Sequence, residues 1–362
     1  GCLPFNKITA QDYEDAVKEG IRLQNEEISA ITRQRSTPTF ENTIVALERS
    51  GELLGRAELA LGNLEHALGD TLLMKALTNV TPLLSEHSAN LLLNEQLFSR
   101  IKQVYDRRNE IPDLTPEDMK LIEQTYLNFA LNGANLKGAD REKYRKLSSE
   151  LSDLNVRFAQ NVTNDMKNPD RRLWIHKNQL GGLPEGIIAA ARAEAKEALE
   201  AEGKPDDEDL YLFTVFYPSY APFMKYSTER DLRRQLNKLY NSRNLGGEFD
   251  NTQILKDIAN VRLEIARLMG KKNYAEFKLQ QTMAANPENV YAMLEELRSS
   301  YTEPMRKEIN EIQEFARQTE GPDFILMPWD YSFWADRLKN ERYAFNDEDM
   351  KPYFELNNTI KG

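Results

Sequence analysis

The side chains that most often carry hydrolytic chemistry are scarce in this sequence and widely separated. The histidines are His66, His87 and His176. None belongs to an H-E-x-x-H pair, the helical spacing that directs two imidazole rings at one zinc ion. We therefore expect these histidines to lie on the surface or to pack between helices. The sequence predicts no catalytic residue and no metal ligand within the chain.

Other reactive side chains lack the neighbours that would activate them. Cys2 is the one cysteine, so an intramolecular disulfide cannot form, and we expect its thiol to be inert. No serine lies in a G-x-S-x-G turn. The Gly-Gly pairs at 181–182 and 246–247 match no phosphate-binding pattern and indicate turns. Adjacent acids such as Glu295 and Glu296 are typical of a solvated helix face.

One segment, residues 327–345, concentrates aromatic side chains beside charged ones. Large aromatic side chains with polar ends suit either a core or the wall of a peptide-binding site. Helical spacing favours the core, because aromatic residues at that spacing most often pack against neighbouring helices. The aromatic and charged residues of the segment include Trp329, Asp330, Tyr331, Phe333, Trp334, Asp336, Arg337 and Tyr343.

Length and charge limit the classes of function. The chain has 362 residues, enough for two or three domains of ordinary size. Its net charge of −11 would repel a nucleic acid, so a nucleic-acid partner is not expected. No segment reaches the roughly 18 uninterrupted apolar residues of a membrane span. We therefore expect neither a nucleic-acid partner nor a membrane span.

Hydrophobic spacing predicts helices along most of the chain. Residues 10–34 follow Thr9 with apolar residues at i, i+3 and i+4, and residues 140–162 repeat this spacing most regularly. Thr115 and Pro116 form a helix start, with Thr115 as the N-cap. These patterns indicate long amphipathic helices.

The same patterns predict where helices end. A long helix is expected from Thr39 to Leu64, and a further helix from Thr71 until Pro82 interrupts it. The helix that begins at Asn286-Pro287 is expected to kink or split at Pro304.

Two short patches break the helical texture. Residues 172–176 and 210–220 are rich in aromatic and β-branched residues and predict a small antiparallel ribbon. The fold class is therefore all-α, mainly long antiparallel helices, with a small antiparallel β-ribbon. We divide the chain into an N-terminal helical subdomain at 1–168, a ribbon-plus-helix segment at 169–245 and a helical segment at 246–362.

Several long stretches resemble one known family in order along the chain. That family is the M3 family of zinc metallopeptidases, in its peptidyl-dipeptidase (dipeptidyl carboxypeptidase) and oligopeptidase A branch. The stretches are PFNKITAQDY, TPTFENTIVALERSG, ERDLRRQLNKLYNSR, GGEFDN, LEIARLMGKKNYAEF, MAANPENVYAML and PWDYSFWADRLKNERYAFNDEDMKPYFEL.

The resemblance implies a nearly all-helical ellipsoid with a central channel that admits short unfolded peptides. In this family the H-E-x-x-H helix, its glutamate ligand and the substrate-positioning side chains follow a Y-F-x-L stretch, which here is 353–356. The chain stops at Gly362, so no zinc ligand or general base carries over. We expect the N-terminal half of such an enzyme, with the catalytic half as its partner, zinc only in the full-length parent, and no activity alone.

The resemblance places residues 246–362 in the channel wall and gives the aromatic segment a role there. Trp329, Asp330, Tyr331 and Trp334 are our candidate wall residues. Release of C-terminal dipeptides is expected in preference to internal cleavage. The family's usual setting favours the cytoplasm, and the start at Gly1 keeps the periplasm as an alternative. A self-contained helical scaffold that binds a peptide or partner without catalysis is the second interpretation.

Overall fold

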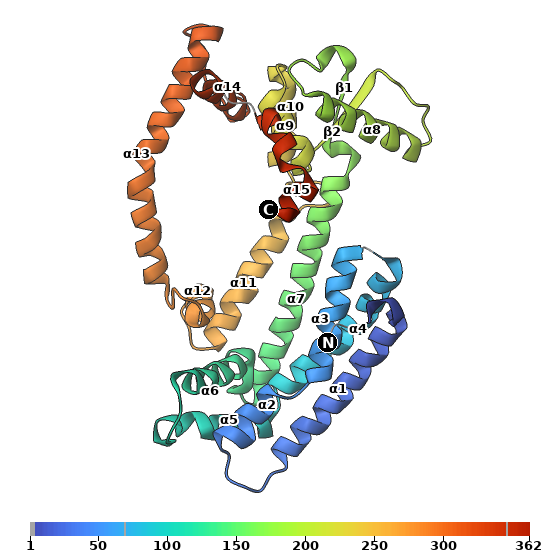
Figure 1. Ribbon diagram of the computed structural model, residues 1–362. Helices are drawn as coiled ribbons and strands as arrows, with labels where there is room; N and C mark the ends of the chain where they lie inside the picture. Colours follow the sequence, from blue (N-terminus) through green and yellow to red (C-terminus); the bar gives the residue numbers. More distant parts are fainter. Residues whose placement is uncertain (1–3, 69, 345–346) are drawn as a thin grey trace. The chain divides into compact units, whose positions relative to one another are not determined.

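The computed structural model describes residues 4–68, 70–344 and 347–362. Most of them are helical. β1 (Arg172–His176) and β2 (Leu210–Thr214) pair as a two-stranded antiparallel sheet (Figure 1). The predicted all-α fold with a small antiparallel ribbon is confirmed.

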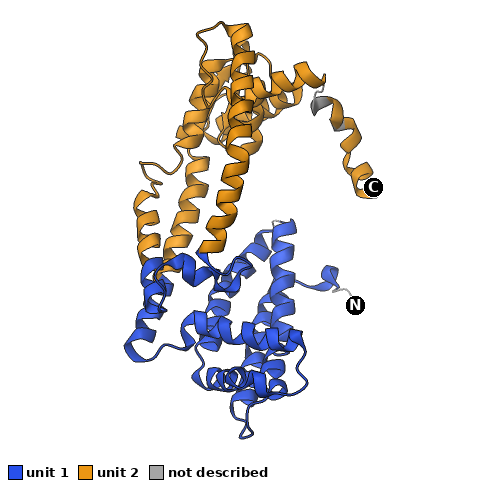
Figure 2. Cartoon of the chain, turned by 90° about the vertical axis from the view of Figure 1, so that its left-hand side faces the viewer, with its two compact units in different colours: residues 1–149, 262–287 blue, residues 150–261, 288–362 orange. Residues whose placement is uncertain are grey.

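The chain divides into two compact units, which Figure 2 colours separately. Unit 1 consists of residues 1–149 and 262–287, and unit 2 of residues 150–261 and 288–362. The predicted division at 168 and 245 remains a prediction.

Unit 1 contains the helices of the N-terminal part. α1 begins where Thr9 and Asp12 form a reciprocal capping box, and α6 begins with Thr115 as N-cap and Pro116 at the first helical position, as predicted. The elements are α1 (Ala10–Thr32), α2 (Ala46–Glu48), α3 (Glu52–Leu68), α4 (Thr71–Leu92), α5 (Glu95–Asp106), α6 (Pro116–Phe129), α12 (Tyr274–Lys278), the π-helical turns Phe40–Val45 and Ala130–Ala134, and the 3-10 turns Phe5–Lys7, Arg108–Glu110 and Leu279–Gln281.

Close packing of α1 on α3 and α4 builds one part of the core of unit 1. Gly20 makes this approach possible, because a Cβ atom there would lie 2.7 Å from the Cα atom of Leu54 in α3. The buried apolar residues of this cluster are Tyr13, Val17, Leu54, Ala57, Leu61, Leu73, Ala76 and Val80. A second cluster joins α1, α5 and α6 through Ile28, Ile31, Ile44, Leu97, Phe98, Ile101, Val104, Ile122 and Phe129.

The predicted helix from Thr39 to Leu64 is wrong as one continuous element. The chain leaves the helix after Glu48 and turns at Gly51, whose φ of 73° is left-handed. The N–H of Gly51 donates to Glu27 Oε2 at 2.7 Å, so a contact with α1 fixes the break. A new helix, α3, then begins at Glu52.

The predicted interruption at Pro82 and the predicted split at Pro304 do not occur, and a kink at Pro304 remains a prediction. α4 continues through Pro82, and α13 (Pro287–Glu320) continues through Pro304 without splitting. In α4 the residues Val80 and His87 are buried on either side of the proline, so packing supports the helix where one backbone bond is lost.

Unit 2 contains the ribbon and the helices around it. The long helices α7 (Gly138–Lys167) and α11 (Thr252–Leu268) each contain a unit boundary. The other elements of unit 2 are α8 (Glu185–Ala201), α9 (Tyr217–Tyr226), α10 (Arg230–Asn241), α13, α14 (Tyr331–Tyr343), α15 (Leu356–Lys361), and the 3-10 turns Pro169–Arg171, Lys177–Gln179 and Asp347–Phe354.

Both faces of the ribbon are covered. Leu173 lies opposite Phe213, and both belong to a core cluster with Phe223 of α9 and Leu236 of α10. The second strand is shorter than the predicted 210–220, because residues 217–220 form the first turn of α9. On the other face Leu212 and Trp174 pack with Ala195 and Ala198 of α8.

The first two-thirds of α13 carries an apolar stripe that the described residues leave exposed. Ile312 and Ala316 near its C-terminal end are buried against Phe324, Phe333 and Trp334. The same helical face continues toward the N-terminus through Leu294, Leu297, Tyr301, Met305 and Ile309, each at least 38% exposed. We call these five residues the α13 stripe. Among the described residues, no helix has the length and apolar character that crossing a membrane requires.

Candidate functional site

The predicted wall residues lie at the start of α14, in unit 2. Asp330 is fully buried and Trp334 is 3% exposed. Tyr331 is 40% exposed, and Trp329 is half-buried. The structure therefore gives the four residues two environments, and their role in a channel wall remains a prediction.

Two arginines of α10 hold the Asp330 carboxylate. Arg230 donates from Nε and Nη2 to Asp330, with a shortest distance of 2.7 Å to Oδ2. Arg233 donates from Nη2 to Asp330 Oδ1 at 2.9 Å. The backbone N–H of Met327 also donates to Oδ2, at 3.1 Å. Each of these partners is a donor, so the buried charge is compensated as a buried carboxylate requires.

Arg233 links this carboxylate to two backbone segments. Its Nη1 donates to the carbonyl of Ser227 at 2.7 Å, and its Nε donates to the carbonyl of Trp329 at 3.1 Å. Burial lowers the pKa of Arg233, whereas the hydrogen bond to Asp330 raises the pKa of the more exposed Arg230. Both guanidinium groups stay charged at neutral pH. The network therefore anchors the aromatic segment to α10.

The aromatic side chains of the segment divide between core and surface. The Trp334 ring makes edge contacts with Phe315, Phe324 and Phe333, as the core interpretation predicted. Tyr331 instead reaches α13, where its hydroxyl donates to Glu308 Oε1 at 3.0 Å. Partial burial raises the pKa of Tyr331, and the contact with Glu308 raises it further.

Arg337, a cation of the aromatic segment itself, shares the ring of Phe333 with Arg233 of α10. The guanidinium carbons of Arg337 and Arg233 lie 3.3 and 4.0 Å from the ring centre, so the ring lies between them. Burial lowers the pKa of Arg337, and repulsion by the Arg233 charge lowers it further. The sequence reasoning did not identify Arg230 and Arg233 as partners of this segment. Their i, i+3 spacing on an amphipathic helix was the available signal.

The histidines lie where the sequence reasoning placed them. His66 and His176 are exposed, and His87 is packed between helices with 7% of its surface exposed. His87 Nε2 lies 2.7 Å from Gln24 Oε1, an acceptor, so this nitrogen carries the proton. The Gln24 amide in turn donates to Ser50 Oγ at 3.2 Å. Burial lowers the pKa of His87.

The described residues do not assemble a metal centre. Within 4–68, 70–344 and 347–362, no three side chains of His, Cys, Asp or Glu lie together in a way that could hold a metal ion. Zinc therefore does not fit the residues that the structure describes. Cys2 lies outside the described residues.

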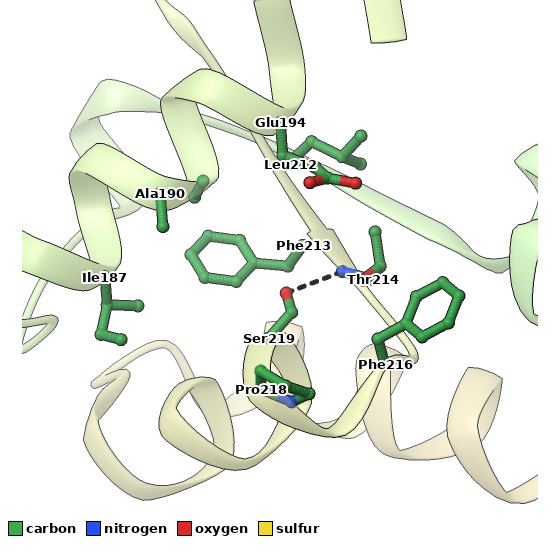
Figure 3. A pocket seen from close by; sticks show the side chains of 10 residues that line it. Ile187, Ala190, Glu194, Leu212, Phe213, Thr214, Phe216, Pro218 and Ser219 are labelled. Carbon is green, nitrogen blue, oxygen red and sulfur yellow. Dashed lines mark hydrogen bonds between the residues drawn. The ribbon is translucent and has the colours of Figure 1, made fainter. Parts of the chain in front are cut away.

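A pocket of about 250 Å³ lies beside the ribbon, between α8, β2 and the start of α9 (Figure 3). Phe213 lies among its apolar lining residues, and Glu194 is its one charged lining residue. Ser219 Oγ accepts a hydrogen bond from the N–H of Thr214 at 3.0 Å. No histidine lines the pocket, so Ser219 lacks the partner that would make it a nucleophile.

Comparison with known proteins identifies peptidases. Residues 223–362 match the model of Peptidase family M3. The chain is 29% identical to oligopeptidase A of Escherichia coli (strain K12), across 99% of the chain and 52% of that protein. It is 30% identical to the probable cytosolic oligopeptidase A of Arabidopsis thaliana, across 98% of the chain and 50% of that protein.

A relative that is named for a different peptidase activity matches a similar share of this chain and of its own length. The dipeptidyl carboxypeptidase of Escherichia coli (strain K12) is 28% identical across 98% of the chain and 51% of its own length. The chain thus spans about half the length of the curated relatives it matches. These matches confirm the predicted resemblance: along its whole length, this chain is similar to about half of a peptidase of the M3 family.

Proposed function

We propose that this chain is a non-catalytic part of a zinc-dependent oligopeptidase that hydrolyses short unfolded peptides and releases dipeptides from their C-termini. The observation that carries the proposal is similarity along 98–99% of the chain to oligopeptidase A and dipeptidyl carboxypeptidase. The family match at 223–362 gives independent support. Of the two activities, we choose dipeptide release.

In this proposal the catalytic chemistry takes place outside this chain. Because the described residues contain no cluster that fits a metal, we assign zinc and bond cleavage to sequence that the relatives have outside the shared half. That catalytic half and short peptides are the proposed partners of this chain. We also propose a cytoplasmic location, with support from the Arabidopsis relative that is named as cytosolic.

Within this proposal the aromatic segment forms part of a channel wall. Trp329 and Tyr331 have exposed surface and would face the peptide. Asp330 and Trp334 are buried, so they would hold that surface in position from beneath. The Arg230–Asp330–Arg233 network supplies the rigidity that such a wall needs.

The test compares this chain with the full product of its gene. We expect the full product to contain stoichiometric zinc and to release the C-terminal dipeptide from a peptide with a free carboxylate, but not from the same peptide with an amidated C-terminus. We expect this chain alone to bind no stoichiometric zinc and to cleave neither peptide. Metal analysis and mass spectrometry of the products measure both.

Three results would contradict parts of the proposal. Cleavage that copurifies with this chain alone would show that it is catalytic. Internal cleavage of the amidated peptide by the full product would contradict dipeptide release. A full product that binds peptides without cleaving them would favour the scaffold interpretation.

A further inference from the structure

A second pocket of unit 2 is formed by α14, the end of α9 and the turn before α8. It contains a cation that has no carboxylate partner among the described residues. The pocket has a volume of about 450 Å³, and Arg337 lines it together with Leu183, Pro184, Tyr226 and Asn340. Arg337 Nη1 donates to the carbonyl of Phe333 at 3.3 Å. Among the described residues, no carboxylate lies within ion-pair distance of Arg337.

The nearest acid is already neutralised. Asp336, the neighbour of Arg337, also lines the pocket and is 8% exposed. Lys225 lies 3.2 Å and Lys339 lies 3.5 Å from Asp336 Oδ1. The Asp336 carboxylate therefore has cations of its own, and the charge of Arg337 stays available, so the pocket favours an anion.

One of the residues that line the pocket, Asn340, has a side-chain acceptor that lacks a donor among the described residues. Asn340 Nδ2 donates to Asp336 Oδ2 at 3.2 Å, which orients the amide, and Asn340 Oδ1 is buried with no hydrogen-bond partner in the part of the chain that the structure describes. A buried acceptor of this kind is costly unless a donor reaches it. Arg337 and Asn340 are three residues apart on α14, so their side chains lie side by side on one helix face.

We propose that this pocket binds the C-terminal residue of a peptide, with its carboxylate on the Arg337 guanidinium and its amide N–H donating to Asn340 Oδ1. The ring of Phe333 holds the guanidinium plane, which favours a paired contact with the two oxygens of a carboxylate. Leu183, Pro184 and Tyr226 provide apolar surface for the terminal side chain. Binding here does not depend on the peptidase proposal, because it requires no bond cleavage.

The experiment titrates the 362-residue chain with a short peptide by isothermal titration calorimetry. We expect the peptide with a free carboxylate to bind about tenfold or more tightly than the same peptide amidated at its C-terminus. Methylation of the last amide nitrogen, which removes the N–H and keeps the carboxylate, should weaken binding several-fold. Inorganic phosphate should compete only weakly.

Variants of α14 assign the effect to the pocket. Arg337→Gln should abolish the preference for the free carboxylate, and Arg337→Lys should keep part of it, because the charge remains without the planar fork. Arg342→Gln is the matched control, since Arg342 lies on the same helix and pairs with Glu311 instead. Circular dichroism verifies that each variant is folded.

Two outcomes would overturn the proposal. Equal binding of the free and amidated peptides would exclude recognition of the carboxylate. Equal binding of the N-methylated peptide, together with full competition by phosphate, would show that the pocket takes any anion. Either result would leave the peptidase proposal untouched, since that proposal is measured by cleavage.

Discussion

Individual residues in this chain are held mainly by charge and hydrogen bonding at buried positions. Asp330 accepts from both Arg230 and Arg233, and these contacts connect positions about 100 residues apart in sequence. Removing one member of such a network leaves a buried charge without its partner, which costs more than the intact pair contributes.

Asp330→Asn should destabilise unit 2 strongly. The substitution leaves the guanidinium of Arg233, which is 2% exposed, without its carboxylate, so we expect a loss of about 3–5 kcal/mol in the free energy of unfolding. Urea unfolding followed by circular dichroism measures it. The control Asp323→Asn removes an exposed acid and should change stability by less than about 0.5 kcal/mol. Equal effects of the two substitutions would show that the network adds no stability.

His87 should make the stability of unit 1 depend on pH. Because burial lowers its pKa, the unfolded chain binds more protons at this ring than the folded chain does. Its contribution is therefore complete above about pH 6.5 and is lost as the pH falls below that value.

Thermal unfolding between about pH 7.5 and pH 5 tests this sign. His87→Gln should lose less stability on acidification than the unsubstituted chain. His66→Gln, which removes an exposed histidine of α3, should retain the original pH dependence. The assignment to His87 is wrong if both variants follow the same curve.

At the scale of elements, helix packing depends on a few close approaches. α1 can lie against α3 because Gly20 has no side chain, and the turn before α3 depends on Gly51 donating to Glu27. These contacts join residues that are far apart in sequence. They determine where one helix ends and where two helices can pack closely.

Gly20→Ala and Gly62→Ala should have opposite signs. A Cβ atom at Gly20 would clash with the backbone of Leu54, so we expect a loss of about 1–3 kcal/mol from overpacking. A Cβ atom at Gly62 in α3 would have no atom of the described residues within 4 Å, so alanine should stabilise the helix by about 0.5–1 kcal/mol. Chemical denaturation measures both. Two substitutions of equal sign would contradict the role of Gly20.

Local signals in the sequence predicted the elements whose limits depend on interactions between neighbouring residues. The helix start after Thr9, the Thr115-Pro116 pair and the strands at 172–176 and 210–214 depend on neighbouring residues, and the structure confirms them. The break at Gly51 depends on a contact with α1, so helical spacing alone did not predict it.

The candidate site was likewise predictable only where local sequence signals determine it. The aromatic segment was recognisable from composition, and Trp334 lies in the core as its helical spacing predicted. The pairing of Asp330 with α10 arises from tertiary folding, which spacing within either segment does not encode.

At the scale of the molecule, the chain covers about half of its relatives and exposes the α13 stripe. Contiguous apolar surface of this kind favours association. We expect the purified chain to self-associate as its concentration rises, which sedimentation velocity measures. The double variant Leu297→Lys, Tyr301→Lys should reduce that association. Leu59→Lys, at an exposed leucine of α3, should leave it unchanged. A chain that stays monomeric at every concentration would contradict the role of the stripe.

The placement of tryptophan separates the two units spectroscopically. The chain contains three tryptophans, Trp174, Trp329 and Trp334, and all of them belong to unit 2. Intrinsic emission excited at the red edge of the absorption band therefore reports on unit 2 alone, while unit 1 contributes only tyrosine signal. Comparison of that emission with the far-ultraviolet signal of the whole chain resolves whether the two units melt together or one after the other.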